Sequence, residues 1–479
     1  MFSFLRILSF AFIAIYLGGN STSLVADEPN VFRLSDPIRV GSGLSPYQGQ
    51  CAMPVNPSRE TDPRIAVNPQ EPDNIAIAYM RFPISTSVGV TVDGGVNWHD
   101  VEPPKSSNCS YHDFDFYGDH DIDVSADGTM FLGIMRSNIY PPTIDFSKEY
   151  GVDSEVAVTL SIDGGFSWNE PVVVSPRGEY QHMVLVHAHQ ARPGWVTVLW
   201  HVNVNYLEFE GEVDHLPDNA VYAVTSKDGG QSWGATVKVS DARGLIDVVE
   251  LDNGTLLTEY FSLPVGLDAT SFETRPIWGA TMLASSDDGG LSWLEPIELP
   301  TQSNTVFFEH PGGERQSGYD GQNLVVGKDG TLHRIVSIYD KMSQTGKVVI
   351  TSSSDAGRTW SGEIPITQIA GVASNAAIGR TGEGDLIAMW YDSADYKQGD
   401  PIATLHARVA VSVDGGETWS LKTLSGAMDV RAASGYFGNY MEIKPTGSNT
   451  AVLSYAAVPP VEVKGDGDLV FVTVSINED

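Results

Sequence analysis

The sequence of 479 residues has few cysteines, few basic residues and few long apolar runs. Two cysteines exclude a disulfide-rich scaffold. The 61 acidic residues outnumber the 28 basic ones, which gives a formal net charge of −33. Such a charge repels phosphate backbones and anionic lipid, so binding to nucleic acid or to a membrane surface is not expected. No stretch after residue 26 approaches the roughly 18 apolar residues of a membrane-spanning helix, so we expect no membrane span.

Residues 1–26 are typical of a secretory signal peptide. Arg6 supplies the positive start, Ile7–Leu17 form an apolar run, and cleavage is expected after Ala26. We therefore expect an exported protein, secreted or periplasmic, whose mature part is residues 27–479.

Export gives a possible role to the two cysteines, Cys51 and Cys109. An isolated pair can form a disulfide in an oxidising compartment. That bond would close a loop of about 59 residues and stabilise the fold by about 3–4 kcal/mol in the chain-entropy model. Two free, buried thiols are the alternative.

One short motif occurs six times along the chain. Its pattern is Ser/Thr-x-Asp-x-Gly-x-x-Trp, and it occupies residues 91–98, 161–168, 226–233, 286–293, 353–360 and 412–419. The motif predicts a hairpin turn in which the hydroxyl and the carboxylate accept hydrogen bonds from backbone N–H groups. Glycine takes the positive φ of the turn, and Trp caps the hairpin. Copies at a regular spacing predict a repeat architecture.

The six motifs resemble the Asp box, or BNR repeat, of the sialidase-like (neuraminidase-type) β-propeller superfamily. The resemblance covers nearly the whole mature chain. It implies a propeller whose boxes lie on the rim of the face away from the active site. We therefore expect the boxes to stabilise the fold and to take no part in chemistry.

Short β-rich runs separated by turn residues surround each motif and predict four strands per repeat. A seventh repeat lacks the motif, and residues 36–43 resemble its missing fourth strand. The sequence thus predicts an all-β, seven-bladed propeller of four-stranded antiparallel blades, closed by the N-terminal strand. Six blades, as in sialidase catalytic domains, are the alternative. The expected blades are residues 60–105, 117–176, 180–240, 245–300, 319–367, 373–424 and 436–479.

Polar residues cluster where the first strand of each repeat begins and where the second strand ends. In a propeller these points meet around a central funnel on one face, where ligands bind. The candidate catalytic residues are Arg64, Asp119, His120, Tyr180, His182, Tyr319 and Asp320. The candidate substrate-binding residues are Asp62, Arg81, Arg136, Arg243 and Glu259.

The resemblance implies a sialidase site with a Tyr nucleophile assisted by Glu, an Asp acid/base and three Arg residues that hold the substrate carboxylate. The segment around Tyr319 resembles the one that carries the nucleophile. Residues 248–257 resemble a family segment flanked by the catalytic Glu and an Arg. Leu245 and Phe261 occupy the matching positions, and Glu259 and Arg243 lie two residues away from them.

The site residues also allow a second chemistry. His120, flanked by Asp119 and Asp121, is a candidate general base or metal ligand. Tyr and His near Arg64 or Arg81 would suit β-elimination of a uronate, because Arg neutralises the carboxylate while Tyr or His moves the proton. Some seven-bladed propellers are polysaccharide lyases, which makes this an analogy from architecture. The alternative is that Asp119 and Asp121 are turn residues and His120 is a structural histidine.

We therefore expect a monomeric, exported protein that cleaves an acidic glycan, as an exo-sialidase-type glycoside hydrolase or a uronate polysaccharide lyase. A non-catalytic propeller that binds a glycan or a protein on the same face is the alternative. The acidic loops would allow a structural calcium ion, although no EF-hand spacing occurs; no other cofactor is expected. His187 and His189 fall near the end of a first strand, away from the funnel, and are expected to be structural.

Overall fold

The computed structural model describes most of one unit, Val31–Asp479. The described residues are 31–40, 60–81, 85–111, 113–114, 116–138, 154–176, 181–202, 220–242, 244–262, 280–302, 306–309, 315–318, 320–340, 342–393, 404–424, 428–429, 438, 440–457 and 468–477. The predicted signal peptide, residues 1–26, and Cys51 lie outside these ranges. Export and the Cys51–Cys109 disulfide therefore stay predictions.

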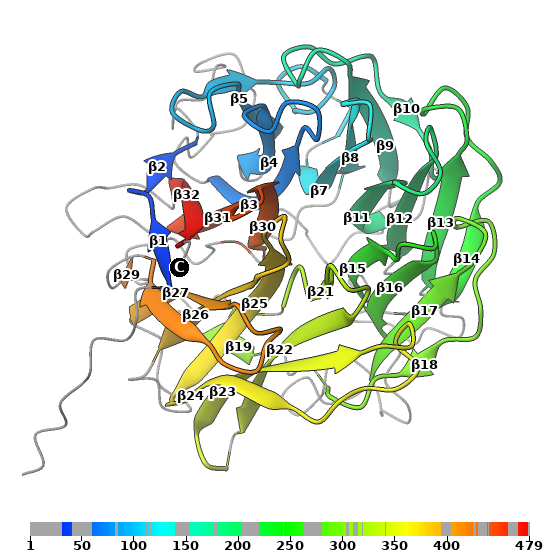
Figure 1. The fold of residues 1–479 in the computed structure, drawn as a ribbon. Coiled ribbons are helices and arrows are strands. Elements are labelled where there is room, and N and C mark those ends of the chain that lie inside the picture. The colour runs from blue at the N-terminus through cyan, green and yellow to red at the C-terminus, as the bar shows by residue number, and fades with distance from the viewer. Residues whose placement is uncertain are drawn as a thin grey trace, which may run out of the picture. The chain divides into compact units, whose positions relative to one another are not determined.

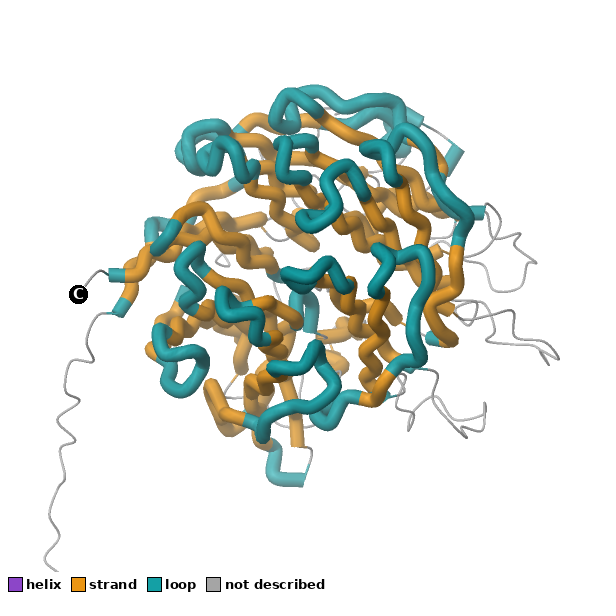
Figure 2. The backbone as a smooth tube through the Cα atoms, turned by 45° about the vertical axis from the view of Figure 1, so that its right-hand side comes forward, coloured by secondary structure: helices purple, strands orange, loops and turns teal. Residues whose placement is uncertain are grey.

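The described part of the chain is all-β and forms the predicted seven-bladed propeller, with no helix among these residues (Figures 1 and 2). Blade 1 consists of β3 (Glu60–Val67), β4 (Ile75–Arg81), β5 (Ser85–Thr91) and β6 (His99–Val101). Blade 2 consists of β7 (Phe116–Val124), β8 (Met130–Ser137), β9 (Ser154–Ser161) and β10 (Val172–Val173). Blade 3 consists of β11 (Gln181–Ala188), β12 (Val196–Val202), β13 (Ala220–Ser226) and β14 (Val237–Asp241). Blade 4 consists of β15 (Gly244–Glu250), β16 (Leu256–Phe261), β17 (Thr281–Ser286) and β18 (Ile297–Glu298).

The remaining blades follow the same antiparallel order. Blade 5 is β21 (Leu324–Val326), β22 (Leu332–Asp340), β23 (Thr345–Ser353), β24 (Ile364–Ala370), and blade 6 is β25 (Val372–Arg380), β26 (Leu386–Ser393), β27 (Thr404–Ser412), β28 (Ser420–Thr423). Blade 7 is β30 (Glu442–Gly447), β31 (Thr450–Ala457) and β32 (Asp468–Ile476) with β1 (Phe32–Leu34) and β2 (Ile38–Arg39). The sequence did not predict the hairpin β19 (Val306–Glu309) and β20 (Arg315–Gly318), or β29 (Met428–Asp429), which pairs with β27.

The N-terminal strands close the ring, as predicted, and lie beside the C-terminal strand (Figure 1). Phe32 pairs with Ile476, and Ile38 pairs with Phe471. Without these partners β32 would be an open edge, which invites aggregation. Pairing begins at Phe32, earlier than the expected start at residue 36, because the Phe32 ring is completely buried in the core of blades 6 and 7.

Most of the core lies between neighbouring blades. One cluster joins Ala78 and Val88 of blade 1 to Leu132 and Ile134 of blade 2. Because side chains alternate along a strand, both faces of each blade can be apolar, and each blade is buried by its two neighbours. In the part of the chain that the structure describes, no helix is long and apolar enough to cross a membrane.

The six repeated turns share one hydrogen-bond pattern, which matches the prediction from the motif. In each turn the Ser/Thr hydroxyl donates to the Asp carboxylate at 2.7–2.9 Å. The same hydroxyl accepts from the second Gly N–H, and the carboxylate accepts from the N–H of the residue before Trp. These bonds lower the pKa of the aspartates, to about 2 in Asp93 and Asp355. The turns are self-contained and stabilise the hairpins.

The fifth turn has Ala356 where the other five have glycine. Its φ is +60°, close to the +70° to +76° of the equivalent glycines, and a Cβ is unfavourable in this left-handed region. We expect Ala356→Gly to raise the free energy of unfolding by about 0.5–1 kcal/mol, as measured by urea denaturation.

The matched control is the reverse change, Gly415→Ala in the sixth turn. No atom lies within 4 Å of a Cβ built at Gly415, where φ is +73°, so this variant tests backbone strain alone. It should lower the free energy of unfolding by a similar amount. Equal stabilities in both variants and the parent would contradict the strain argument.

Candidate functional site

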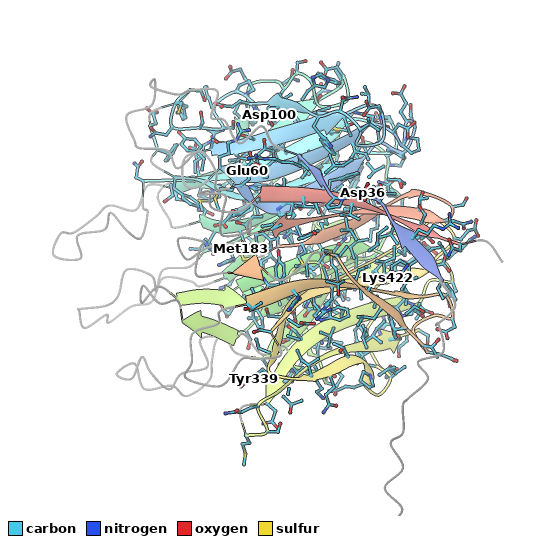
Figure 3. The ribbon with its side chains drawn as sticks, turned by 90° about the vertical axis from the view of Figure 1, so that its left-hand side faces the viewer. Asp36, Glu60, Asp100, Met183, Tyr339 and Lys422 are labelled. Carbon is cyan, nitrogen blue, oxygen red and sulfur yellow. The ribbon has the colours of Figure 1, made fainter. Side chains whose placement is uncertain are left out.

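The inner strand of most blades is irregular near its first residue. Register shifts interrupt the pairing of β3, β7, β11, β15 and β25 there. Four residues at these bulges have positive φ values between 43° and 58°, namely Asp62, Asp119, Met183 and Asn375. A bulge re-aims the side chains beside it, and strained backbone is common at functional sites. We call one face of the ring the upper face: it is the face at which the inner strands begin and the second strands end. Glu60, Met183 and Tyr339 lie toward this face, which is on the left in Figure 3.

Two predicted catalytic residues meet at these bulges. Nε2 of His182 on β11 lies 3.1 Å from a carboxylate oxygen of Asp119 on β7 of the neighbouring blade. The side chains are 27% and 14% exposed, so a substrate can reach them. The His201 ring on β12 packs edge-on against His182, with centroids 4.9 Å apart. Burial, and then the neighbouring His182, hold the pKa of His201 well below its usual value, so His201 stays neutral.

Below the bulges, polar side chains fill the centre of the ring. A cavity of about 70 Å³ is lined there by inner-strand residues of several blades, among them Arg64, Asp121, Asp247, Gln322, Glu442 and Lys444. Arg64 lies 3.7 Å from Asp121 and stacks on the Tyr440 ring at 4.3 Å. Glu442 and Lys444 also line this cavity, although they were not among the residues predicted from the sequence. Their signal is the alternation of polar and apolar residues at the start of the seventh repeat.

Burial dominates the protonation of this centre. Burial would lower the pKa of Arg64, but Asp121 and Glu442 outweigh it, so the pKa is raised and Arg64 stays charged. Burial raises the pKa of Asp121 to about 7, against the opposing effect of Arg64. Burial and then Arg64 lower the pKa of His120 to about 4, so this 2%-exposed histidine is neutral. The His120 side chain is therefore buried and uncharged, whereas the His182 side chain is partly exposed.

Other predicted residues form buried ion pairs, within one blade or, for Glu259, between neighbouring blades. Arg81 donates to Tyr79 and Asp100 and lies 3.6 Å from Glu60. Arg136 pairs with Glu155 at 3.0 Å. Glu259, which is fully buried, accepts two hydrogen bonds from Arg334. The structure does not bring these arginines to one point.

The remaining predicted residues divide into buried ones and undescribed ones. Asp320 accepts hydrogen bonds from Ser337 and from the Ala376 N–H, and Asp62 is buried at its bulge. Tyr180, Tyr319 and Arg243 lie outside the described residues, so their roles stay predictions.

No family model and no curated protein matches the sequence. Solved structures do resemble the fold. The chain is similar to a polysaccharide lyase described as a PL25 ulvan lyase, with a TM-score of 0.50, 11% identity, and coverage of 86% of this chain and 94% of that one. It is also similar to an α-L-arabinofuranosidase from Fusarium graminearum (TM-score 0.47, 11% identity, coverage 92% and 98%) and to a Trypanosoma rangeli sialidase (TM-score 0.43, 13% identity, coverage 75% and 55%). At these identities the similarity shows the fold alone, which is the propeller expected from the repeats.

Asp247 gives the centre a testable pH dependence. Burial raises its pKa to about 7, although its carboxylate accepts from the Leu324 and Val248 N–H groups. An unfolded Asp titrates near pH 4, so the folded state binds the extra proton between about pH 4 and 7. The stability contribution is therefore present at low pH and is lost as pH rises through this window, by at most about 1.4 kcal/mol per pH unit.

We expect Asp247→Asn to reduce the loss of unfolding free energy between pH 5 and 8, because the amide is uncharged and its oxygen still accepts from Leu324. Urea denaturation at the two pH values measures it. The exposed residue Asp252 provides the control, since Asp252→Asn should leave the pH difference unchanged. An unchanged difference in Asp247→Asn would show that Asp247 stays charged in the fold.

Proposed function

We propose that this protein is a carbohydrate-active enzyme that cleaves an acidic polysaccharide at its upper face by β-elimination at a uronate. The observation that carries the proposal is the partly exposed His182–Asp119 pair, which two neighbouring blades bring together at strained strand starts. The fold adds support, because a structure with the same architecture is described as a polysaccharide lyase. Export to a periplasmic or extracellular location, as residues 1–26 suggest, would give the enzyme access to such a polymer.

The pair suits proton abstraction next to a carboxylate. Nδ1 of His182 is buried, so Nε2, which lies beside Asp119, is the ring nitrogen that we propose as the base. In the proposed step, Nε2 of the neutral imidazole removes the C5 proton of the uronate, the C4–O bond breaks, and a C4=C5 double bond forms. The leaving oxygen takes a proton from a general acid. Asp119 then stabilises the imidazolium until the proton leaves.

The other roles rest on predicted residues. Tyr180 and Tyr319 are the candidates for the general acid, because each precedes the first strand of a repeat in the sequence. Arg243 is the candidate for neutralising the uronate carboxylate, since the guanidinium of Arg64 is already balanced by Asp121 and Glu442.

A sialidase mechanism has less support. It requires three arginines around one substrate carboxylate and a Glu that assists a Tyr nucleophile. Glu259, the candidate for that Glu, is buried in a pair with Arg334. Arg81 and Arg136 form ion pairs within separate blades. Removing any of these partners would leave a buried charge uncompensated, so we assign them to stability.

We expect His182→Ala to reduce the rate of uronate elimination by about 10²- to 10⁴-fold, the usual contribution of a general base. Asp119→Asn should reduce it less, because the imidazole remains. The assay follows the ultraviolet absorbance of the unsaturated product over a panel of uronate polysaccharides, with a fluorogenic sialoside in parallel.

His99 provides the control, because it is an exposed histidine on the outer strand β6. His99→Ala should keep full activity, and thermal melting should show that every variant is folded. Release of the sialoside by the parent protein would instead favour the hydrolase. Tight binding of a polysaccharide, with no turnover and no effect of His182→Ala, would favour the non-catalytic alternative.

A further inference from the structure

A second group of side chains lies at the other end of two inner strands, β11 and β15, away from their bulges. His187 and His189 stand at the end of β11 and just after it, and Glu250 is the last residue of β15 in the next blade. Residues two apart on an extended chain point to the same side, so both imidazoles face Glu250. Their ligand atoms, one from each residue, all lie within 4.8 Å of one another.

We propose that these three side chains bind a divalent transition-metal ion, with Zn²⁺ as the best fit, which links blades 3 and 4. Two imidazole nitrogens and one carboxylate oxygen are a common zinc donor set. His187 Nε2 lies 3.4 Å from Oε2 of Glu250, and His189 Nδ1 lies 3.3 Å from Oε1, so each nitrogen is at ligand-to-ligand distance from one carboxylate oxygen. Tetrahedral zinc with bonds of about 2.0–2.1 Å holds adjacent ligand atoms about 3.3 Å apart.

Two buried atoms of this group lack hydrogen bonds and face each other. They are Nδ1 of His189, whose side chain is fully buried, and Oε1 of Glu250, whose side chain is 4% exposed. A buried polar atom without a partner costs free energy, and two facing lone pairs repel each other. A cation between them removes both costs.

The surroundings orient the three ligands. Nε2 of His189 lies 2.8 Å from the Thr197 hydroxyl, which can accept the Nε2 proton and leave Nδ1 to the metal. The Glu250 carboxylate accepts from the Gln190 N–H at 2.6 Å, which fixes its position. Asp123 lies 3.7 Å from His187 Nδ1, on the side opposite the metal-binding nitrogen. Such outer partners are typical of metal-binding histidines.

The site has an open side and a balanced charge. His187 also lines the central cavity, so a water molecule from the cavity can occupy the fourth position. Arg192 lies 3.9 Å from Glu250, but it donates to the Gly254 and Asp287 carbonyls, which hold it at the edge of the group. Nitrogen donors favour zinc over the calcium that the acidic loops suggested. This site is independent of the proposed lyase chemistry.

The test loads the purified protein with ZnCl₂, removes loose metal by gel filtration and measures bound zinc by mass spectrometry. We expect about one zinc per chain in the parent, and less than about 0.1 in His189→Ala and Glu250→Gln, because each variant loses a ligand. Zinc should raise the melting temperature of the parent and of neither variant. Cobalt loading should give the intense visible absorption of tetrahedral Co²⁺ in the parent alone.

Two variants make the result decisive. Glu250→Gln keeps an oxygen that can accept from Gln190, so it should fold even if His189→Ala does not. His333→Asn removes another largely buried histidine, which contacts the Ser352 hydroxyl, and it should retain zinc. The proposal is overturned if the parent retains no zinc and shows no change in melting temperature. Equal zinc loss in His333→Asn would also overturn it, because the metal would then be adventitious.

Discussion

Among the described strands, the inner strand of each blade has one edge that no other strand pairs, and the fold depends on how the N–H groups of those edges are satisfied. Side chains of another blade supply the acceptors. Asp121 accepts from the Val186 N–H and Asp247 from the Leu324 N–H, each at 2.8 Å, and Glu442 accepts from the Ile65 N–H. A buried N–H without a partner costs about 1–3 kcal/mol, so carboxylates at the centre of the ring are a structural requirement.

This requirement explains why a propeller with an apolar core keeps charges at its centre. Each carboxylate that accepts from a buried N–H is itself desolvated. The positive charges of Arg64 and Lys444 offset part of the negative charge at the centre of the ring. Burial also raises the pKa of Asp121 and Asp247 to about 7. Buried ions stabilise a fold only when they are paired and hydrogen-bonded. The same constraint limits function, since a carboxylate held by backbone N–H groups is unavailable to a substrate. Partly exposed side chains such as His182 and Asp119 stay accessible to a ligand.

The sequence predicted the architecture well because the repeat is local. Each turn motif contains its own hydrogen-bonding partners, so six copies identify six hairpins without knowledge of tertiary contacts. The closure by the N-terminus followed from the missing fourth strand of the last repeat. The site was harder to predict, because polar residues at strand starts look alike in sequence. Burial separates them: Arg81 and Glu259 are held in ion pairs, His120 is enclosed, and His182 is accessible.

His187 and His189, at the end of β11, also show that the sequence does not reveal which side chains of another blade lie beside a residue. His187 and His189 were expected to be structural because they lie away from the upper face, yet Glu250 joins them from a strand about 60 residues later in the sequence. No local pattern encodes that meeting, since it depends on the register between two blades. A propeller sets this register twice, through the carboxylates at the centre and through the apolar layers between blades. Residues at equivalent heights on neighbouring inner strands are therefore held close together. In this way the fold brings His182 to Asp119 at one end of the inner strands and His187 to Glu250 at the other.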